Sequence, residues 1–155
     1  MTTQTALPVD RNSVAALSRE LHEPEWMTDL RLAAYDAAEK LELPHLEKTR
    51  ISDWPIWAYG THKPGQTASG IDLLPEQALR LLEDDVKQHL LVQRNSSVIY
   101  RSLPEELKAK GVIFTDLGQA VREHGDLVRA HFMQAVKADE NVLTALHAAL
   151  WNGGV

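Results

Sequence analysis

The chain has 155 residues, of which 44% are hydrophobic and 25% charged, with 22 acidic side chains, 16 basic ones and no cysteine. This length and composition favour one soluble globular domain, or one domain with a tail, over wholesale disorder. A net charge of -6 argues against binding to nucleic-acid backbones or anionic membranes. The lack of cysteine excludes disulfides, thiolate nucleophiles and cysteine-ligated zinc or iron–sulfur clusters within this chain.

The beginning of the chain carries no recognisable targeting signal. Residues 1–10 lack the basic and apolar regions of a secretory signal peptide. No apolar run approaches the roughly 20 residues that a membrane-spanning helix needs. We therefore expect a cytoplasmic protein with neither a nucleic-acid nor a membrane partner.

The N-terminal residues predict a tail followed by a short helix. Residues 1–9 show no hydrophobic period and are expected to form a flexible tail. Asn12 or Ser13 is the expected cap of the helix, because the side-chain oxygen of either can accept from a free N–H of the first turn. Its apolar stripe, at helical spacing, comprises Val14, Leu17 and Leu21.

A second, stronger helical pattern follows. Pro24 suits the start of this helix, where its missing N–H costs nothing, and Pro44 marks its end. Arg31 is assigned to the polar face. The predicted buried face comprises Trp26, Leu30, Ala33, Ala34, Ala37 and Leu41.

From residue 44 to residue 70 the periodicity disappears, and the Gly, Pro and Ser residues predict an irregular loop that is flexible near 55–70. Trp54 and Trp57 lie in this loop. Aromatic side chains either anchor a loop by burial or present a face to a partner, and both alternatives are open here. The acidic neighbour Asp53 disfavours nucleic acid as that partner.

The middle of the second half predicts short helices and one β-hairpin. Pro75 starts a short helix, and residues 90–100 form two apolar runs separated by a polar turn, which is typical of a hairpin. Pro104 opens another helix, and Gly111 can close it in the left-handed conformation. Residues 112–114 form an apolar run of strand length.

Three further helices are predicted at the end, capped by Asp116, Asp126 and Asp139, and Gly125 separates the first two. The sequence thus predicts an α+β fold that is mainly helical, with a small hairpin. Residues 10–155 are expected to form a single domain.

The sequence contains no familiar catalytic or metal-binding spacing. The candidate metal ligands are Glu123, His124, Asp126 and His131. Gly125 interrupts the helix that would align them, and the spacings of known zinc motifs are absent. No serine lies in a G-x-S-x-G elbow, and no phosphate-binding loop is present. We therefore expect no enzymatic activity, no metal and no cofactor in this chain.

The chain ends in an unusual way. A helix stop and two glycines precede Val155, an apolar β-former, where chains more often end in polar residues. The sequence therefore looks interrupted. Leu150, Trp151 and Val155 are predicted to be exposed and, with Trp54 and Trp57, to be a candidate interaction surface.

Several of these segments, taken in order, resemble one known family. The segments are 23–27 (EPEWM), 30–31 (LR), 43–44 (LP), 48–54 (KTRISDW), 91–95 (LVQRN), 103–107 (LPEEL), 111–117 (GVIFTDL) and 145–155 (ALHAALWNGGV). Together they resemble the SufB/SufD family of SUF iron–sulfur cluster assembly proteins. The N-terminal segments are more similar to the SufD branch of Gram-positive bacteria than to the SufB branch. The resemblance covers residues 10–155, although the loop at 55–70 follows no family pattern.

The resemblance implies a role and a larger protein. Members of this family are non-catalytic scaffold subunits that work in a complex with SufB and the ATPase SufC. They continue into a right-handed parallel β-helix and a C-terminal helical region, so this chain resembles their N-terminal domain without the β-helix core. The alternative is a self-contained protein- or ligand-binding module without enzymatic activity, with Trp54 and Trp57 in its binding surface.

Overall fold

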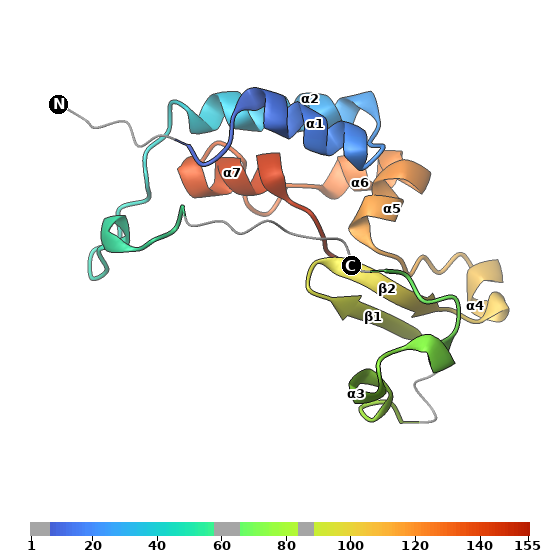
Figure 1. Ribbon diagram of the computed structural model, residues 1–155. Helices are drawn as coiled ribbons and strands as arrows, with labels where there is room; N and C mark the ends of the chain where they lie inside the picture. Colours follow the sequence, from blue (N-terminus) through green and yellow to red (C-terminus); the bar gives the residue numbers. More distant parts are fainter. Residues whose placement is uncertain (1–6, 58–65, 84–88) are drawn as a thin grey trace. The chain divides into compact units, whose positions relative to one another are not determined.

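The computed structural model describes residues 7–57, 66–83 and 89–155. Within these residues it contains α-helices α1 to α7 and one antiparallel sheet of two strands, so the predicted α+β class is confirmed (Figure 1). Two compact units can be distinguished. The first comprises residues 1–61 and 121–151, and the second comprises residues 62–120 and 152–155.

The core of the first unit lies between three helices, α1 (Arg11–Glu20), α2 (Glu25–Ala38) and α7 (Val142–Leu150). Helix α2 packs against both α1 and α7 (Figure 1). Many of the contacts are made by alanine, and small side chains allow helix axes to approach closely. The buried residues of this core are Val14, Ala34, Tyr35, Ala38, Val142, Ala145, Leu146, Ala148 and Ala149.

Part of the predicted tail packs onto this core. Residues 1–6 lie outside the described part of the chain, but Leu7 and Val9 pack against the buried residues. The hydroxyl of Tyr35 donates to the carbonyl oxygen of Val9 at 3.2 Å. Burial of the ring raises the pKa of Tyr35.

The cap of α1 differs from the prediction. The N-cap residue is Asp10, whose carboxylate accepts from the backbone N–H of Ser13 at 2.7 Å, so the expected cap at Asn12 or Ser13 is wrong. This hydrogen bond lowers the pKa of Asp10. Its stabilising contribution is therefore present above the ordinary carboxyl pKa and is lost as the pH falls through the lowered value.

The cap of α7 differs from the prediction as well and lies two residues later. Asn141, and not Asp139, accepts from the backbone N–H groups of Leu143 and Thr144 at 3.0 and 3.2 Å. The hydroxyl of Thr144 accepts in return from the N–H of Asn141 at 3.1 Å, which completes a capping box. The reciprocal bond favours Asn141, because it satisfies one more free N–H group than a lone aspartate would.

The two preceding helices are α5 (Leu117–Glu123) and α6 (Gly125–His131). Asp116 caps α5 as predicted, since its carboxylate accepts from the N–H of Gln119 at 2.8 Å. The predicted cap of α6 is wrong. Asp126 lies within the first turn of α6, and His124 occupies the cap position without a side-chain hydrogen bond.

The buried face of α2 is rotated from the predicted one by one residue, which corresponds to about 100° around the helix axis. Ala34 belongs to both faces, but Arg31 moves from the predicted polar face into the interior. The residues buried on α2 are Met27, Arg31, Ala34, Tyr35 and Ala38.

The second unit contains the predicted hairpin, which is confirmed. Strands β1 (Leu90–Arg94) and β2 (Ser97–Ser102) pair antiparallel, with a register irregularity between Val92 and Gln93. At the tip, Asn95 takes a left-handed conformation with φ of 56°. Of the predicted flexible loop, residues 58–65 lie outside the described part, whereas the backbone N–H of Ala68 donates to the carbonyl of Ile99 at 2.6 Å.

Two short helices of this unit follow the prediction, but the apolar run does not. Helices α3 (Glu76–Leu79) and α4 (Glu105–Ala109) both follow a proline, and Gly111 ends α4 with φ of 82°, as expected. Residues 112–114 are exposed and belong to no strand, so the strand interpretation of this run is wrong. A strand needs a neighbouring backbone, and the sheet of the described residues comprises β1 and β2 only.

The last residues lie along this unit. The backbone N–H of Leu117 donates to the carbonyl oxygen of Gly154 at 3.0 Å. Gly153 lies so close to the hairpin tip that a β-carbon there would be 2.5 Å from the carbonyl oxygen of Ser96. Any larger residue at Gly153 would force the two backbones apart.

Candidate functional site

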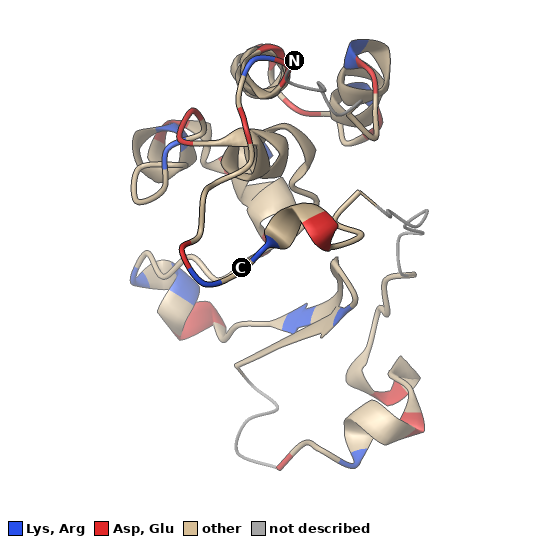
Figure 2. Ribbon diagram, turned by 90° about the vertical axis from the view of Figure 1, so that its left-hand side faces the viewer, with Lys and Arg blue, Asp and Glu red and all other residues tan. Residues whose placement is uncertain are grey.

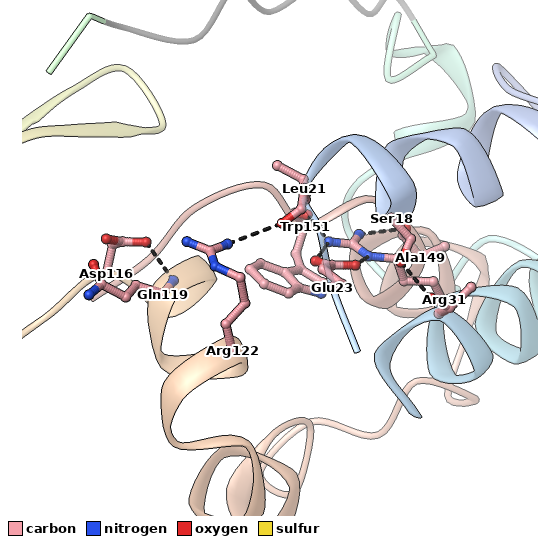
Figure 3. Close-up of polar contacts among 10 residues, drawn as sticks. Ser18, Leu21, Glu23, Arg31, Asp116, Gln119, Arg122, Ala149 and Trp151 are labelled. Atoms are coloured by element: carbon pink, nitrogen blue, oxygen red, sulfur yellow. Dashed lines mark hydrogen bonds and ion pairs between the residues drawn. The ribbon is translucent and has the colours of Figure 1, made fainter. Parts of the chain in front are cut away.

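The side chain of Arg31, in the first unit, is entirely buried and makes four hydrogen bonds (Figure 3). Its Nε and Nη2 atoms donate to the two carboxylate oxygens of Glu23 at 2.7 and 2.6 Å. The Glu23 side chain is equally inaccessible to solvent. The pair is bidentate, the geometry in which guanidinium and carboxylate groups bind each other most strongly.

Two further donors of Arg31 reach the end of α7. Nη1 donates to the carbonyl oxygen of Ala149, and Nη2 donates to that of Trp151, both at 2.9 Å (Figure 3). These carbonyls belong to the C-terminal end of a helix, where oxygens lack intrahelical partners and cations are favourable. Arg31 thereby caps α7 from a neighbouring helix.

Trp151 covers the guanidinium. The central carbon of the Arg31 guanidinium lies 4.5 Å from the centroid of the Trp151 ring, which is a cation–π distance. The ring of Phe132 packs against the same indole, with 5.4 Å between centroids. Within the described residues, the Nε1 atom of Trp151 is buried without a hydrogen-bond partner.

Two further contacts hold the junction between α1 and α2. The hydroxyl groups of Ser18 and Thr28 lie 2.7 Å apart and join the two helices. Arg122 donates to the carbonyl oxygen of Leu21 at 3.1 Å (Figure 3). The Arg31 cluster therefore ties the α1–α2 junction to the end of α7. The side chains of Arg31 and Glu23 are closed to solvent, and their hydrogen bonds join these helices.

The two tryptophans of the predicted interaction surface have different environments. Trp54 follows the short 3₁₀ helix η1 (Ile51–Asp53) and is 56% exposed. Trp57 is half-buried and packs against the core cluster that contains Ala38 and Leu146. Trp57 thus anchors the loop, whereas Trp54 is available to a partner.

The C-terminal residues of that surface also differ. Val155 is 71% exposed, but Trp151 is only 6% exposed and belongs to the Arg31 cluster. Leu150 is half-buried and packs against the helical core. The predicted exposure of Trp151 is therefore wrong, because its ring packs against Arg31 and Phe132. Val155 is exposed as predicted, and the interaction surface itself stays a prediction.

The candidate metal ligands His124 and His131 both lie in the described part of the chain. Within the residues described, no three His, Asp or Glu side chains are placed to hold a metal ion. His131 instead lines a shallow groove of about 500 Å³ together with His147. The rest of the groove is largely apolar, with Met133, Val136 and Leu143 among its lining residues.

Sequence reasoning missed Arg31 and Glu23. One signal was present, because Arg31 lies four residues after Met27 and four before Tyr35, which places it on an apolar stripe. The other half of the signal is not local. The carbonyl acceptors of Arg31 lie 118 and 120 residues away.

Relatives with established names match nearly the whole chain. SufBD family proteins of iron–sulfur cluster assembly from Pyrococcus horikoshii and Staphylococcus haemolyticus are each 32% identical to it, over 100% and 92% of its length. No family model matches. The chain is thus similar to SufBD family proteins over nearly its whole length, as its motifs predicted.

The chain is also similar to the iron–sulfur cluster assembly protein SufD of Bacillus subtilis, with 42% identity over 157 residues and 99% of the chain. The aligned region is 36% of that SufD, and it is 37% and 33% of the two other relatives. The chain therefore spans about a third of the length of the relatives it matches. Among the described residues, no helix is long and apolar enough to cross a bilayer.

Proposed function

We propose that this chain is the N-terminal domain of a non-catalytic scaffold subunit in iron–sulfur cluster assembly. The observation that carries the proposal is the 42% identity to SufD of Bacillus subtilis over 99% of the chain. The interior supports it, because the Arg31–Glu23 cluster joins α2 to the end of α7 and is closed to solvent. Such a cluster suits a domain whose role is to hold a shape.

The proposed partners are those of a SUF complex, SufB and the ATPase SufC, in the cytoplasm. On this proposal the ATPase activity belongs to SufC, and the parts of the subunit that contact SufC lie outside this chain. The 155-residue chain by itself is therefore expected to capture little or no SufC.

A chimera tests the proposal. The matching third of Bacillus subtilis SufD is replaced by this chain, and the chimera is expressed in cells that lack their own SufD. The chimera is expected to restore at least half of the activity of an iron–sulfur enzyme and to co-purify with SufB and SufC. A SufD variant that lacks the region altogether is the control. A soluble chimera that restores no more activity than this control would contradict the proposal.

We further propose that the isolated chain holds no iron–sulfur cluster, because it contains no cysteine to supply thiolate ligands. Anaerobic reconstitution with iron and sulfide, followed by desalting, is expected to leave no visible charge-transfer absorption and no stoichiometric iron. Full-length SufD taken through the same procedure is the matched comparison. A stable brown species with a fixed ratio of iron to protein would show that other side chains ligate a cluster.

A further inference from the structure

The second unit contains a pocket of about 600 Å³ beside the hairpin tip. Two buried apolar residues, Leu74 and Ile99, are part of its lining. Its polar lining includes Thr67, Ser69, Arg94 and Asn95. The volume lies in the range of small-molecule sites. The pocket is open to solvent on one side, and its polar lining residues are exposed.

The charge of the pocket comes from one arginine. The hairpin contains two arginines and no acidic residue, and Figure 2 shows only basic charge on its strands. Arg101 is paired, with 3.5 Å to a carboxylate oxygen of Asp116 and 2.8 Å to the hydroxyl of Thr115. Among the residues described, the guanidinium of Arg94 has no such partner, and no acidic residue lines the pocket.

The backbone holds this arrangement in place. The N–H of Ala68 donates to the carbonyl of Ile99 at 2.6 Å, so the segment with Thr67 and Ser69 lies along the outer edge of β2. At the tip, the side-chain Nε2 of Gln93 donates to the backbone carbonyl of Asn95 at 2.6 Å and supports its left-handed backbone. Polar side chains from two separate segments therefore line one pocket.

We propose that this pocket binds a small organic anion, a monocarboxylate with a short apolar chain. The carboxylate pairs with the guanidinium of Arg94, because guanidinium groups bind carboxylates through two parallel hydrogen bonds. The hydroxyl groups of Thr67 and Ser69 supply further donors, and the apolar chain lies against Leu74 and Ile99. This site is independent of the proposed scaffold role, which does not depend on it.

Hexanoate is the probe, titrated into the ¹⁵N-labelled 155-residue chain and followed by amide chemical shifts. Saturable shifts are expected in residues 66–75 and 94–99. Hexanamide keeps the apolar chain without the charge, and acetate keeps the charge without the chain. Each is expected to bind at least about tenfold more weakly, which corresponds to about 1.4 kcal/mol.

Two arginine variants separate the site from general electrostatics. Arg94→Gln is expected to weaken hexanoate binding about tenfold, whereas Arg80→Gln is expected to leave it unchanged. Arg80 lies outside the pocket lining and pairs with Glu76 on an exposed helix. The amide spectrum of each free variant verifies its fold. The absence of saturable shifts, or equal affinity of the parent chain and Arg94→Gln, would overturn the proposal.

Discussion

Replacing Arg31 with methionine is expected to lower the free energy of unfolding by about 3–5 kcal/mol, because it leaves a buried carboxylate without its partner. Both oxygens of Glu23 accept from Arg31, and neither side chain is accessible to solvent. The carbonyl oxygens of Ala149 and Trp151 lose a donor as well. Urea denaturation followed by far-ultraviolet circular dichroism measures the loss.

The exposed pair of Arg11 and Asp36 provides the matched control. It is also an arginine–carboxylate pair, with 2.9 Å between Nε of Arg11 and Oδ1 of Asp36. Its side chains, however, are 55% and 43% exposed. Arg11→Met is therefore expected to cost about 0–1 kcal/mol, since water already solvates both charges. Equal losses of unfolding free energy in Arg31→Met and Arg11→Met would contradict the prediction that burial makes the Arg31–Glu23 pair the costlier one to break.

A double variant distinguishes an unpaired charge from lost packing. In Arg31→Met with Glu23→Leu, both charges are gone, so part of the stability lost in Arg31→Met is expected to return. The recovery of unfolding free energy should be incomplete, because the two carbonyl oxygens at the end of α7 still lack the Arg31 donor. A double variant less stable than Arg31→Met alone would show that the unpaired carboxylate is not the main cost.

The elements that could be predicted from the sequence are those that local chemistry determines. The hairpin of residues 90–102, the cap at Asp116 and the left-handed Gly111 all follow from residue types within a few positions of each other. The class of the fold follows from the same local patterns. The family could be named because its motifs are also local runs of residues.

The errors occurred where competing local signals are equal or where the deciding contact is distant. Asp10 and Asn141 outcompete neighbouring candidate caps, because each reaches the correct N–H group while Asn12 and Asp139 do not. Residues 112–114 have the composition of a strand, but no strand of the described residues pairs with them.

Arg31 combines both difficulties. An arginine on an apolar stripe is ordinarily assigned to the solvent side, since burying a charge costs free energy unless it is paired and hydrogen-bonded. The partners that offset this cost come from the α1–α2 junction and from the far end of the chain. No short window of sequence contains them together.

Replacing Trp151 with alanine is the other substitution with a large expected effect, a loss of about 3–5 kcal/mol in the free energy of unfolding. The indole is 6% exposed, lies against the ring of Phe132 and covers the guanidinium of Arg31. Its removal opens a cavity beside a buried ion pair. Because Trp151 and Arg31 are in contact, their losses are expected to be less than additive in a combined variant.

Trp54 offers the same substitution in a different environment. It is 56% exposed, so Trp54→Ala is expected to change the free energy of unfolding by no more than about 0.5 kcal/mol. Trp151→Phe keeps an aromatic ring and loses no hydrogen bond, since the indole nitrogen has no partner within the described residues. It is therefore expected to cost less than half as much as Trp151→Ala and to remain folded. Equal losses of unfolding free energy in Trp54→Ala and Trp151→Ala would contradict the burial of Trp151 in the helical core.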